Sequence, residues 1–177
     1  MSEQVLIPLG DLIDAWGPND VGKLLNTFVC TRDPDLERFL RQDAIPFHEK
    51  HRSRTYLLLS EDGRKVLAYT TIGIKCLKVS EGMKLSNKIK KEMDVHKGVF
   101  QSYLIGQLGK ADGAERGMGP KLIEFAISVF DQSFRSVGCR TVRLDCKQSL
   151  IKFYEGNGFK LISKEEDDDL FHMVMLF

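Results

Sequence analysis

Two glycines in the second half of the chain have the spacing of a phosphate-binding turn. Gly117 and Gly119 precede a stretch whose apolar residues recur at three- and four-residue steps up to Val137, which predicts an amphipathic helix. Glycines permit a sharp bend and the close approach of another molecule, and Pro120 suits the first helical position. Free amides and the positive end of the helix dipole favour an anion there. A turn without a ligand explains two glycines equally well.

A second candidate for chemistry is Tyr154, in the stretch Phe153-Tyr-Glu-Gly-Asn-Gly-Phe159. A tyrosine has a pKa of about 10, so at neutral pH it holds a proton that it can donate to a departing group. The alternative is a half-buried core tyrosine whose hydroxyl is satisfied elsewhere.

The two features, in this order, resemble the GNAT superfamily of acyl-CoA-dependent N-acetyltransferases. In that family the turn has the form Gln/Arg-x-x-Gly-x-Gly/Ala, and a later stretch has the form Phe/Leu-Tyr-x-x-x-Gly-Phe; here Ala114 departs from the first turn position. The resemblance implies that the turn amides bind the pyrophosphate of acetyl-CoA, the co-substrate, and that Tyr154 protonates the departing thiolate. Lys147 stands where many members carry an Asn, and it either reaches a cofactor phosphate or is exposed. The residues predicted to bind the cofactor are Leu108, Gly109, Lys110, Glu115, Arg116, Gly117, Met118, Gly119 and Lys147.

The resemblance also implies an α/β (α+β) fold of GNAT type. Its central mixed, mostly antiparallel sheet has about six to seven strands flanked by helices, and it splays at the acyl-CoA site between the strands at Ser102 and Arg140. We expect a single acetyltransferase domain over residues 1–177, because this length suits one domain with a substantial core.

Local patterns place the remaining elements. Asp33 and Pro34 predict the start of a helix, and Pro46 should interrupt it. The Asp-Gly pair at Gly63 predicts a hairpin. Strands are predicted over Val5–Trp16, Thr55–Ser60, Lys65–Lys78, from Ser102, and over Cys139–Asp145, Phe159–Ser163 and Leu170–Phe177; helices are predicted from Asp33 to Ala44, over Phe47–Arg52 and over Gln148–Gly156.

The polar segment from Ser80 to Gly98 is predicted to be a helical insertion between two strands. Leu85, Ile89 and Met93 form a thin apolar stripe at four-residue spacing. Five lysines lie in the same segment, and they mark either a solvated surface helix or a patch that binds RNA phosphates in a salt-sensitive way. The acidic run Glu165–Asp169 is predicted to be the turn of a final hairpin.

Bulk properties exclude several classes of protein. No apolar run approaches the roughly 20 residues that cross a bilayer, and the N-terminus lacks the basic start of a signal peptide. A formal net charge of +1 gives no global preference for nucleic acid. The four cysteines lack Cys-x-x-Cys spacing and a neighbouring His pattern, which favours reduced thiols in a cytoplasm over a metal site or disulfides.

Short patterns narrow the resemblance to the toxin-type acetyltransferases of bacterial toxin-antitoxin pairs. They are Phe28-x-Cys30, Leu36-x-x-Phe39-Leu40-x-x-x-Ala44, Arg54-Thr55-Tyr56 and Leu104-Ile-Gly106-Gln107-Leu108-Gly109. Those toxins acetylate the α-amino group of aminoacyl-tRNA, and the resemblance implies an antitoxin partner; many relatives form homodimers. An α-amine, with a pKa near 7.7 to 8.0, is neutral far more often at pH 7 than a lysine amine near 10.4, so it needs little help from a base. The sequence does not identify a general base.

Other interpretations stay open. The acceptor is alternatively a small-molecule or protein amine, or the chain is a non-catalytic module that binds acyl-CoA. For the mechanism, direct attack of the amine on the thioester competes with a Cys nucleophile, for which Cys146 at a strand end is the best candidate.

Overall fold

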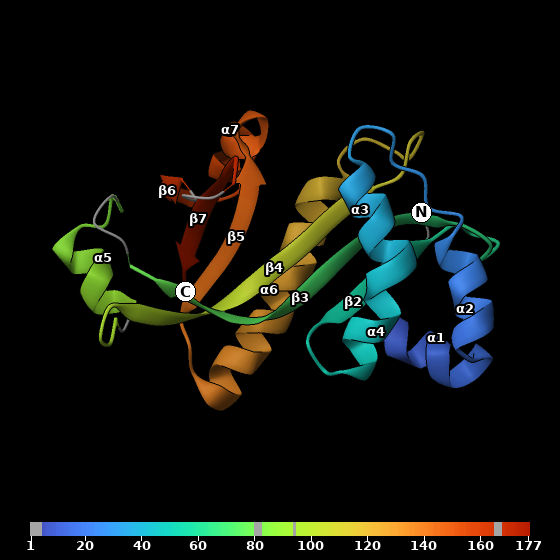
Figure 1. Ribbon diagram of the computed structural model, residues 1–177, viewed down its shortest axis with the longest axis horizontal. Coiled ribbons are helices and arrows are strands. Elements are labelled where there is room, and N and C mark those ends of the chain that lie inside the picture. The colour runs from blue at the N-terminus through green and yellow to red at the C-terminus, as the bar shows by residue number, and fades with distance from the viewer. Residues whose placement is uncertain (1–4, 80–82, 94, 165–167) are drawn as a thin grey trace. The chain divides into compact units, whose positions relative to one another are not determined.

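The computed structural model describes residues 5–79, 83–93, 95–164 and 168–177. Seven strands form one mixed sheet in the order β1-β2-β3-β4-β5-β7-β6 (Figure 1). The strands are β1 (Ile7–Pro8), β2 (Arg54–Leu59), β3 (Val66–Lys78), β4 (Val99–Lys110), β5 (Thr141–Lys147), β6 (Lys160–Lys164) and β7 (Leu170–Leu176). Pairing is parallel between β4 and β5 and antiparallel in β1–β2, β2–β3, β5–β7 and β6–β7. The predicted mixed, mostly antiparallel sheet of about six to seven strands is confirmed.

The chain forms two compact units. The first comprises Met1–Gly73 and Gln107–Leu122, and the second comprises Ile74–Gly106 and Ile123–Phe177. The parallel register of β4 and β5 lies within the second unit and runs from Tyr103 with Val142 to Ile105 with Leu144. The expectation of a single domain stays a prediction.

The N-terminal segment corrects one prediction. Instead of a strand over Val5–Trp16, the chain forms the two-residue strand β1 and then helix α1 (Leu9–Trp16), which is followed by α2 (Pro18–Leu25). Leu9 and Leu12 are buried one helical turn apart, and burial at that spacing favours a helix over an alternating strand. Gly10 lies inside this helix. Its lack of a side chain makes room for the ring of His48, whose Cε1 would lie 2.6 Å from an added Cβ.

The next helical segment begins at Pro34, as predicted, and consists of α3 (Pro34–Arg38), the π-helical turn η1 (Phe39–Asp43) and α4 (Ala44–Glu49). Pro46 does not interrupt it as predicted. The π-helical turn ends with the amide of Ala44 bonded to the carbonyl of Phe39, and Pro46 then falls in the first turn of α4, where a missing amide is tolerated. The core of this unit includes Leu40, Leu57 and Tyr69.

Helix α6 (Met118–Val137) follows β4, and it belongs to the second unit from Ile123 on. Within the second unit, α7 (Ile151–Gly156) follows β5 through the 3-10 turn η2 (Gln148–Leu150). The ring of Phe130 on α6 stacks on Tyr103 of β4 with centroids 4.9 Å apart. Gly138 ends α6 as predicted, with φ of 83° and its amide bonded to the Phe134 carbonyl. The strands and helices predicted after Ser102 are therefore all present.

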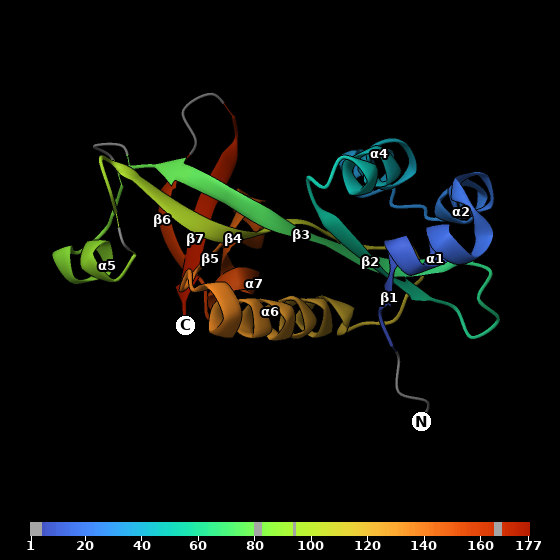
Figure 2. The same ribbon diagram turned by 90° about the horizontal axis from the view of Figure 1, so that it is seen from below.

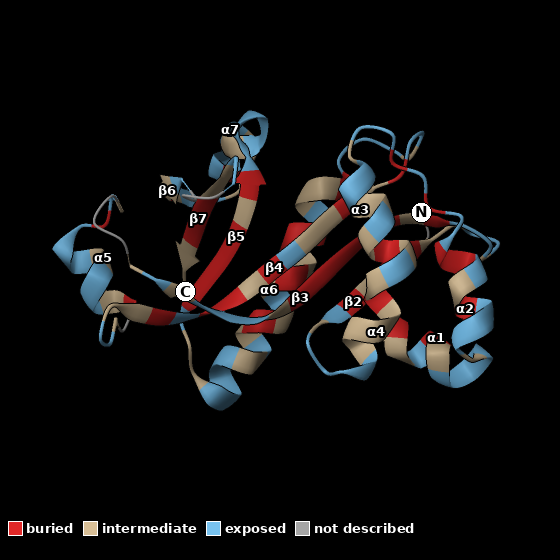
Figure 3. Ribbon diagram, viewed as in Figure 1, coloured by how far each residue is buried: buried red, intermediate tan, exposed pale blue. Residues whose placement is uncertain are grey.

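The polar segment before β4 carries a short helix, α5 (Asn87–Glu92) (Figure 2). The side chain of Ser86 caps it by accepting from the amide of Ile89. Leu85 and Met93 are buried in a cluster with Phe100, Ile162 and Val174, and Ile89 packs against it, which confirms the predicted apolar stripe. Figure 3 shows the exposed outer face of α5. Residues 80–82 and 94 of this segment, and 165–167 of the predicted acidic turn, lie outside the described residues.

Candidate functional site

The loop between β4 and α6 carries the predicted phosphate-binding turn, in the first unit. The ammonium group of Lys110, the last residue of β4, donates to the carbonyls of Ala114 at 2.6 Å and Glu115 at 3.2 Å. Gly117 has φ of 83°, a left-handed conformation in which an L side chain is strained. Lys110 therefore folds the loop back, and Gly117 reverses the chain into the first turn of α6.

The exposed part of this turn fits an anionic pyrophosphate. Glu115, Arg116 and Gly117 are exposed, and nothing lies within 4 Å of a Cβ placed at Gly117. α6 begins at Met118, so the amides of its first turn lack helical partners and carry the positive end of the dipole. Pro120 removes one of these donors. The charges of Lys110 and Arg116 add to the same preference for an anion.

Three other predicted residues hold the turn rather than present side chains to a ligand. Met118 is 3% exposed and packs with Leu58, Ala68 and Leu122, and Leu108 lies against the same cluster. A Cβ at Gly109 would lie 2.7 Å from Tyr69 Cε1 and 3.2 Å from Phe28 Cζ. Gly109 is thus required for packing, and a ligand meets only the backbone at these positions.

The second unit holds the other two predicted residues, Tyr154 and Lys147. Tyr154 lies on α7, is 7% exposed, and packs edge-on against Phe153 and Phe159 with ring centroids 5.0 and 6.1 Å away. Burial, and to a smaller extent the neighbouring Cys146 thiol, raise the pKa of its hydroxyl. Among the described residues that hydroxyl makes no hydrogen bond, so it is a protonated donor without a protein acceptor. Lys147 is exposed at the end of β5.

Cys146 has the burial and the raised thiol pKa of a core residue. It is buried, its Sγ lies 3.5 Å from Met173 Sδ, and burial followed by the charge of Asp145 raises the pKa of its thiol to about 11. Because the thiolate is the nucleophilic form, this environment opposes covalent catalysis by Cys146.

The sequence did not predict a buried polar network on β5 and β7. Asp145 Oδ1 lies 2.6 Å from His172 Nδ1 on β7, and Asp145 Oδ2 lies 3.4 Å from Arg143 Nη2, with Arg143 only 4% exposed. Arg143 and Asp145, at alternate positions of one predicted strand, were the available signal, because they share one face. The pairing with His172 depends on the β5–β7 register.

Among the described residues, no group of three metal-ligating side chains comes together. Across the same residues, no helix combines the length and apolar character that a membrane crossing requires.

The fold of the chain is similar to those of several solved proteins. No family model matches the chain, and no curated protein matches its sequence. Among solved structures, AtaT complexed with acetyl-methionyl-tRNAfMet is 20% identical, with a TM-score of 0.73 over 96% of this chain and 94% of that one. A tyrosine-to-phenylalanine mutant of KacT is 21% identical, with a TM-score of 0.71 over 87% and 89%.

A third likeness is to an AtaT tyrosine-to-phenylalanine mutant bound to acetyl-CoA and the C-terminus of the antitoxin AtaR. It is 19% identical, with a TM-score of 0.64 over 86% of this chain and 84% of that one. The chain thus has the GNAT fold that its motifs predicted, in the form found in the AtaT and KacT toxins.

Proposed function

We propose that the chain is an N-acetyltransferase that moves the acetyl group of acetyl-CoA directly to a primary amine, the α-amino group of an aminoacyl-tRNA. The observation that carries the proposal is the likeness along almost the whole chain to AtaT complexed with acetyl-methionyl-tRNAfMet. The glycine turn before α6 and the protonated Tyr154 on α7 supply the two features that the chemistry needs.

In the proposed reaction, the neutral amine attacks the thioester carbonyl, the C–N bond forms and the C–S bond breaks. Tyr154 gives its proton to the departing thiolate, and the amine loses a proton to water. The raised pKa of Tyr154 keeps that proton in place at neutral pH. The raised pKa of Cys146 favours this single transfer over an acyl-cysteine intermediate.

The cofactor would bind through the backbone amides of residues 115–119. Lys110 supports this turn from β4, and Arg116 adds an exposed positive charge. Lys147, at the far end of β5, is proposed to reach a phosphate of the cofactor. Leu108, Gly109 and Met118 would contribute backbone groups only, because packing occupies their side-chain positions.

A basic surface on α5 and the segment just before it supports RNA as the acceptor. Lys84, Lys88, Lys90 and Lys91 are exposed, and among the described residues none of them forms an ion pair. The apolar stripe of this segment faces the core, so the lysines face solvent. With a formal net charge of only +1 on the whole chain, this cluster is a local excess that suits phosphates.

The same proposal places the protein in the cytoplasm, where aminoacyl-tRNA is made, with an antitoxin as its protein partner. The AtaT structure with the C-terminus of AtaR supports such a partner. A homodimer stays an expectation.

The test is transfer of labelled acetyl from acetyl-CoA to charged tRNA, beside deacylated tRNA, small amines and peptides. Label on charged but not on deacylated tRNA is the expected result. Transfer only to small amines or peptides would contradict tRNA as the acceptor and would still support an acetyltransferase. Binding of acetyl-CoA without any transfer would contradict the enzyme and support a non-catalytic module that binds acyl-CoA.

A further inference from the structure

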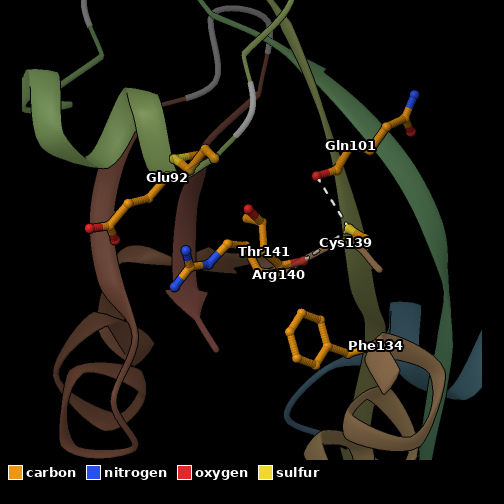
Figure 4. A pocket seen from close by; sticks show the side chains of 7 residues that line it. Glu92, Gln101, Phe134, Cys139, Arg140 and Thr141 are labelled. Atoms are coloured by element: carbon orange, nitrogen blue, oxygen red, sulfur yellow. Dashed lines mark hydrogen bonds between the residues drawn. The ribbon is translucent and has the colours of Figure 1, made fainter. Parts of the chain in front are cut away.

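The second unit contains a pocket of about 240 Å³ where β5 begins (Figure 4). Four parts of the fold line it: the end of α5, the start of β4, the last part of α6 and the segment that leads into β5. The lining residues are Glu92, Met93, Gln101, Phe134, Cys139, Arg140 and Thr141. Thr141 and Lys147 are the two ends of β5, about 20 Å apart at ~3.3 Å per residue. The pocket is therefore separate from Lys147, and from Tyr154 beside Cys146, the proposed acetyl-transfer residues of the second unit.

Its walls combine both charges with an apolar surface. Figure 4 shows the carboxylate of Glu92 and the guanidinium of Arg140 toward one side and the ring of Phe134 on the other. Phe134 is 37% exposed although it is a large apolar residue, and it stacks on Phe177 at 5.4 Å between centroids. Met93 adds a buried apolar surface.

Hydrogen bonds hold the pocket in place. Arg140 Nη2 donates to the Phe177 carbonyl at 2.9 Å, which orients the guanidinium while its other N–H groups stay without a bond among the described residues. The hydroxyl of Tyr103 donates to the Gly138 carbonyl at 2.6 Å, and the thiol of Cys139 lies 3.6 Å from the Gln101 carbonyl. The walls are thus built by four elements of the fold.

The two charges are not paired with each other. Within the described part of the chain, Glu92 takes part in no ion pair, and no Asp or Glu carboxylate lies within 4 Å of the Arg140 guanidinium, whose bond goes to the backbone oxygen of Phe177. A ligand that offers a carboxylate to a guanidinium forms charge-assisted hydrogen bonds, and an ammonium group is the complement of Glu92. The volume is below that of pockets for drug-sized ligands, which suits a single small molecule.

We propose that this pocket binds a free α-amino acid with an apolar side chain. Its carboxylate meets Arg140, its ammonium group meets Glu92, and its side chain packs on Phe134 and Met93. An α-amino acid carries both charges on one carbon, so a single molecule of this class satisfies both walls. This ligand site is additional to the proposed acetyl transfer and does not depend on it.

The test is a titration of the ¹⁵N-labelled protein with free L-methionine, followed by amide chemical shifts. Saturable shifts are expected at Met93 and Thr141 and not at Tyr154, which separates this pocket from the proposed acceptor site. The amine lacking the carboxylate, 3-(methylthio)propylamine, and the acid lacking the ammonium group, 4-(methylthio)butanoate, should each bind at least about tenfold more weakly, since each loses a charge-assisted contact.

Matched variants complete the test. Arg140→Gln and Glu92→Gln should each weaken methionine binding about tenfold, whereas Arg64→Gln and Glu61→Gln, exposed residues of the β2–β3 turn, should leave it unchanged. All four positions lie outside the buried core, so the variants should stay folded even though Arg140→Gln loses the bond to Phe177, and thermal melting checks this. The absence of saturable shifts at Met93 and Thr141, or binding that neither pocket variant weakens, overturns the proposal.

Discussion

At the scale of single residues, the same buried environment affects two candidate reactive groups, Tyr154 and Cys146, in different ways. Tyr154 and Cys146 are both buried in the second unit, and burial raises the pKa of both. The shift leaves the proposed acid protonated at neutral pH, as an unshifted tyrosine also is, whereas it suppresses the thiolate of Cys146. A general acid is useful while protonated, and a nucleophilic thiol is useful when deprotonated.

Replacing Tyr154 with Phe is expected to lower kcat for acetyl transfer by about 10²-fold or more, because it removes the proton donor for the thiolate. Stability should change little, since the Tyr154 hydroxyl makes no hydrogen bond among the described residues. The measurement is steady-state transfer together with acetyl-CoA binding, which should keep its affinity. Tyr103→Phe is the matched control, because it removes a hydroxyl bonded to Gly138 and leaves the proposed acid in place. Equal activity of Tyr154→Phe and wild type would remove Tyr154 from the mechanism.

At the scale of elements, the glycine turn depends on backbone conformation. Gly117→Ala forces a side chain into φ of 83°, which costs about 1–2 kcal/mol and tilts the first amides of α6. We expect the KM for acetyl-CoA to rise several-fold in steady-state kinetics. Gly22→Ala is the control. It lies inside α2 with nothing within 4 Å of the new Cβ, so it should raise the free energy of unfolding by about 0.5–1 kcal/mol. An unchanged KM in Gly117→Ala would contradict a backbone cradle at this turn.

Helix α5 gives a second prediction at this scale. Lys88→Glu combined with Lys91→Glu should raise the KM for charged tRNA at least tenfold and flatten its dependence on salt, because two phosphate contacts are lost. Transfer to a small amine should not change. Lys50→Glu with Lys65→Glu reverses two exposed lysines of the first unit and serves as the charge-matched control. If both double variants lower tRNA transfer equally, the effect belongs to net charge and not to α5.

At the scale of the whole molecule, tyrosine burial predicts how stability depends on pH. All four tyrosines of the sequence have a raised pKa, through burial as the largest cause. Above about pH 10 the unfolded chain ionises tyrosines that the folded chain keeps protonated, so the unfolded state binds fewer protons and stability falls with rising pH.

The free energy of unfolding should therefore begin to fall above about pH 9. Once the pH exceeds 10, it should fall by about 1.4 kcal/mol per pH unit for each tyrosine that stays protonated in the folded protein. Urea unfolding measures it, and absorbance at 295 nm reports ionisation directly. Tyr154→Phe should show a shallower fall than wild type. A flat profile, or tyrosines that ionise near pH 10 in the folded protein, would refute it.

The sequence by itself determined the elements whose signals are local. The period of residues 118–137 specified α6, the Asp-Gly pair specified the β2–β3 hairpin, and Gly138 specified a helix end, because each depends on neighbours within a few residues. The glycine turn and Tyr154 also stand in short local patterns, but their roles follow from the family resemblance and stay predictions. Local rules misassigned α1 and Pro46, where packing of Leu9 and Leu12 and a π-helical turn decided the conformation.

Only the tertiary structure decided which side chains meet. Asp145 and His172 are 27 residues apart and touch because β5 and β7 pair in one particular register. Gly109 is required by Tyr69 and Phe28, and Glu92 and Arg140 line one pocket although they lie on different elements. Contacts between residues distant in the chain depend on how whole elements pack, and no local pattern encodes that packing.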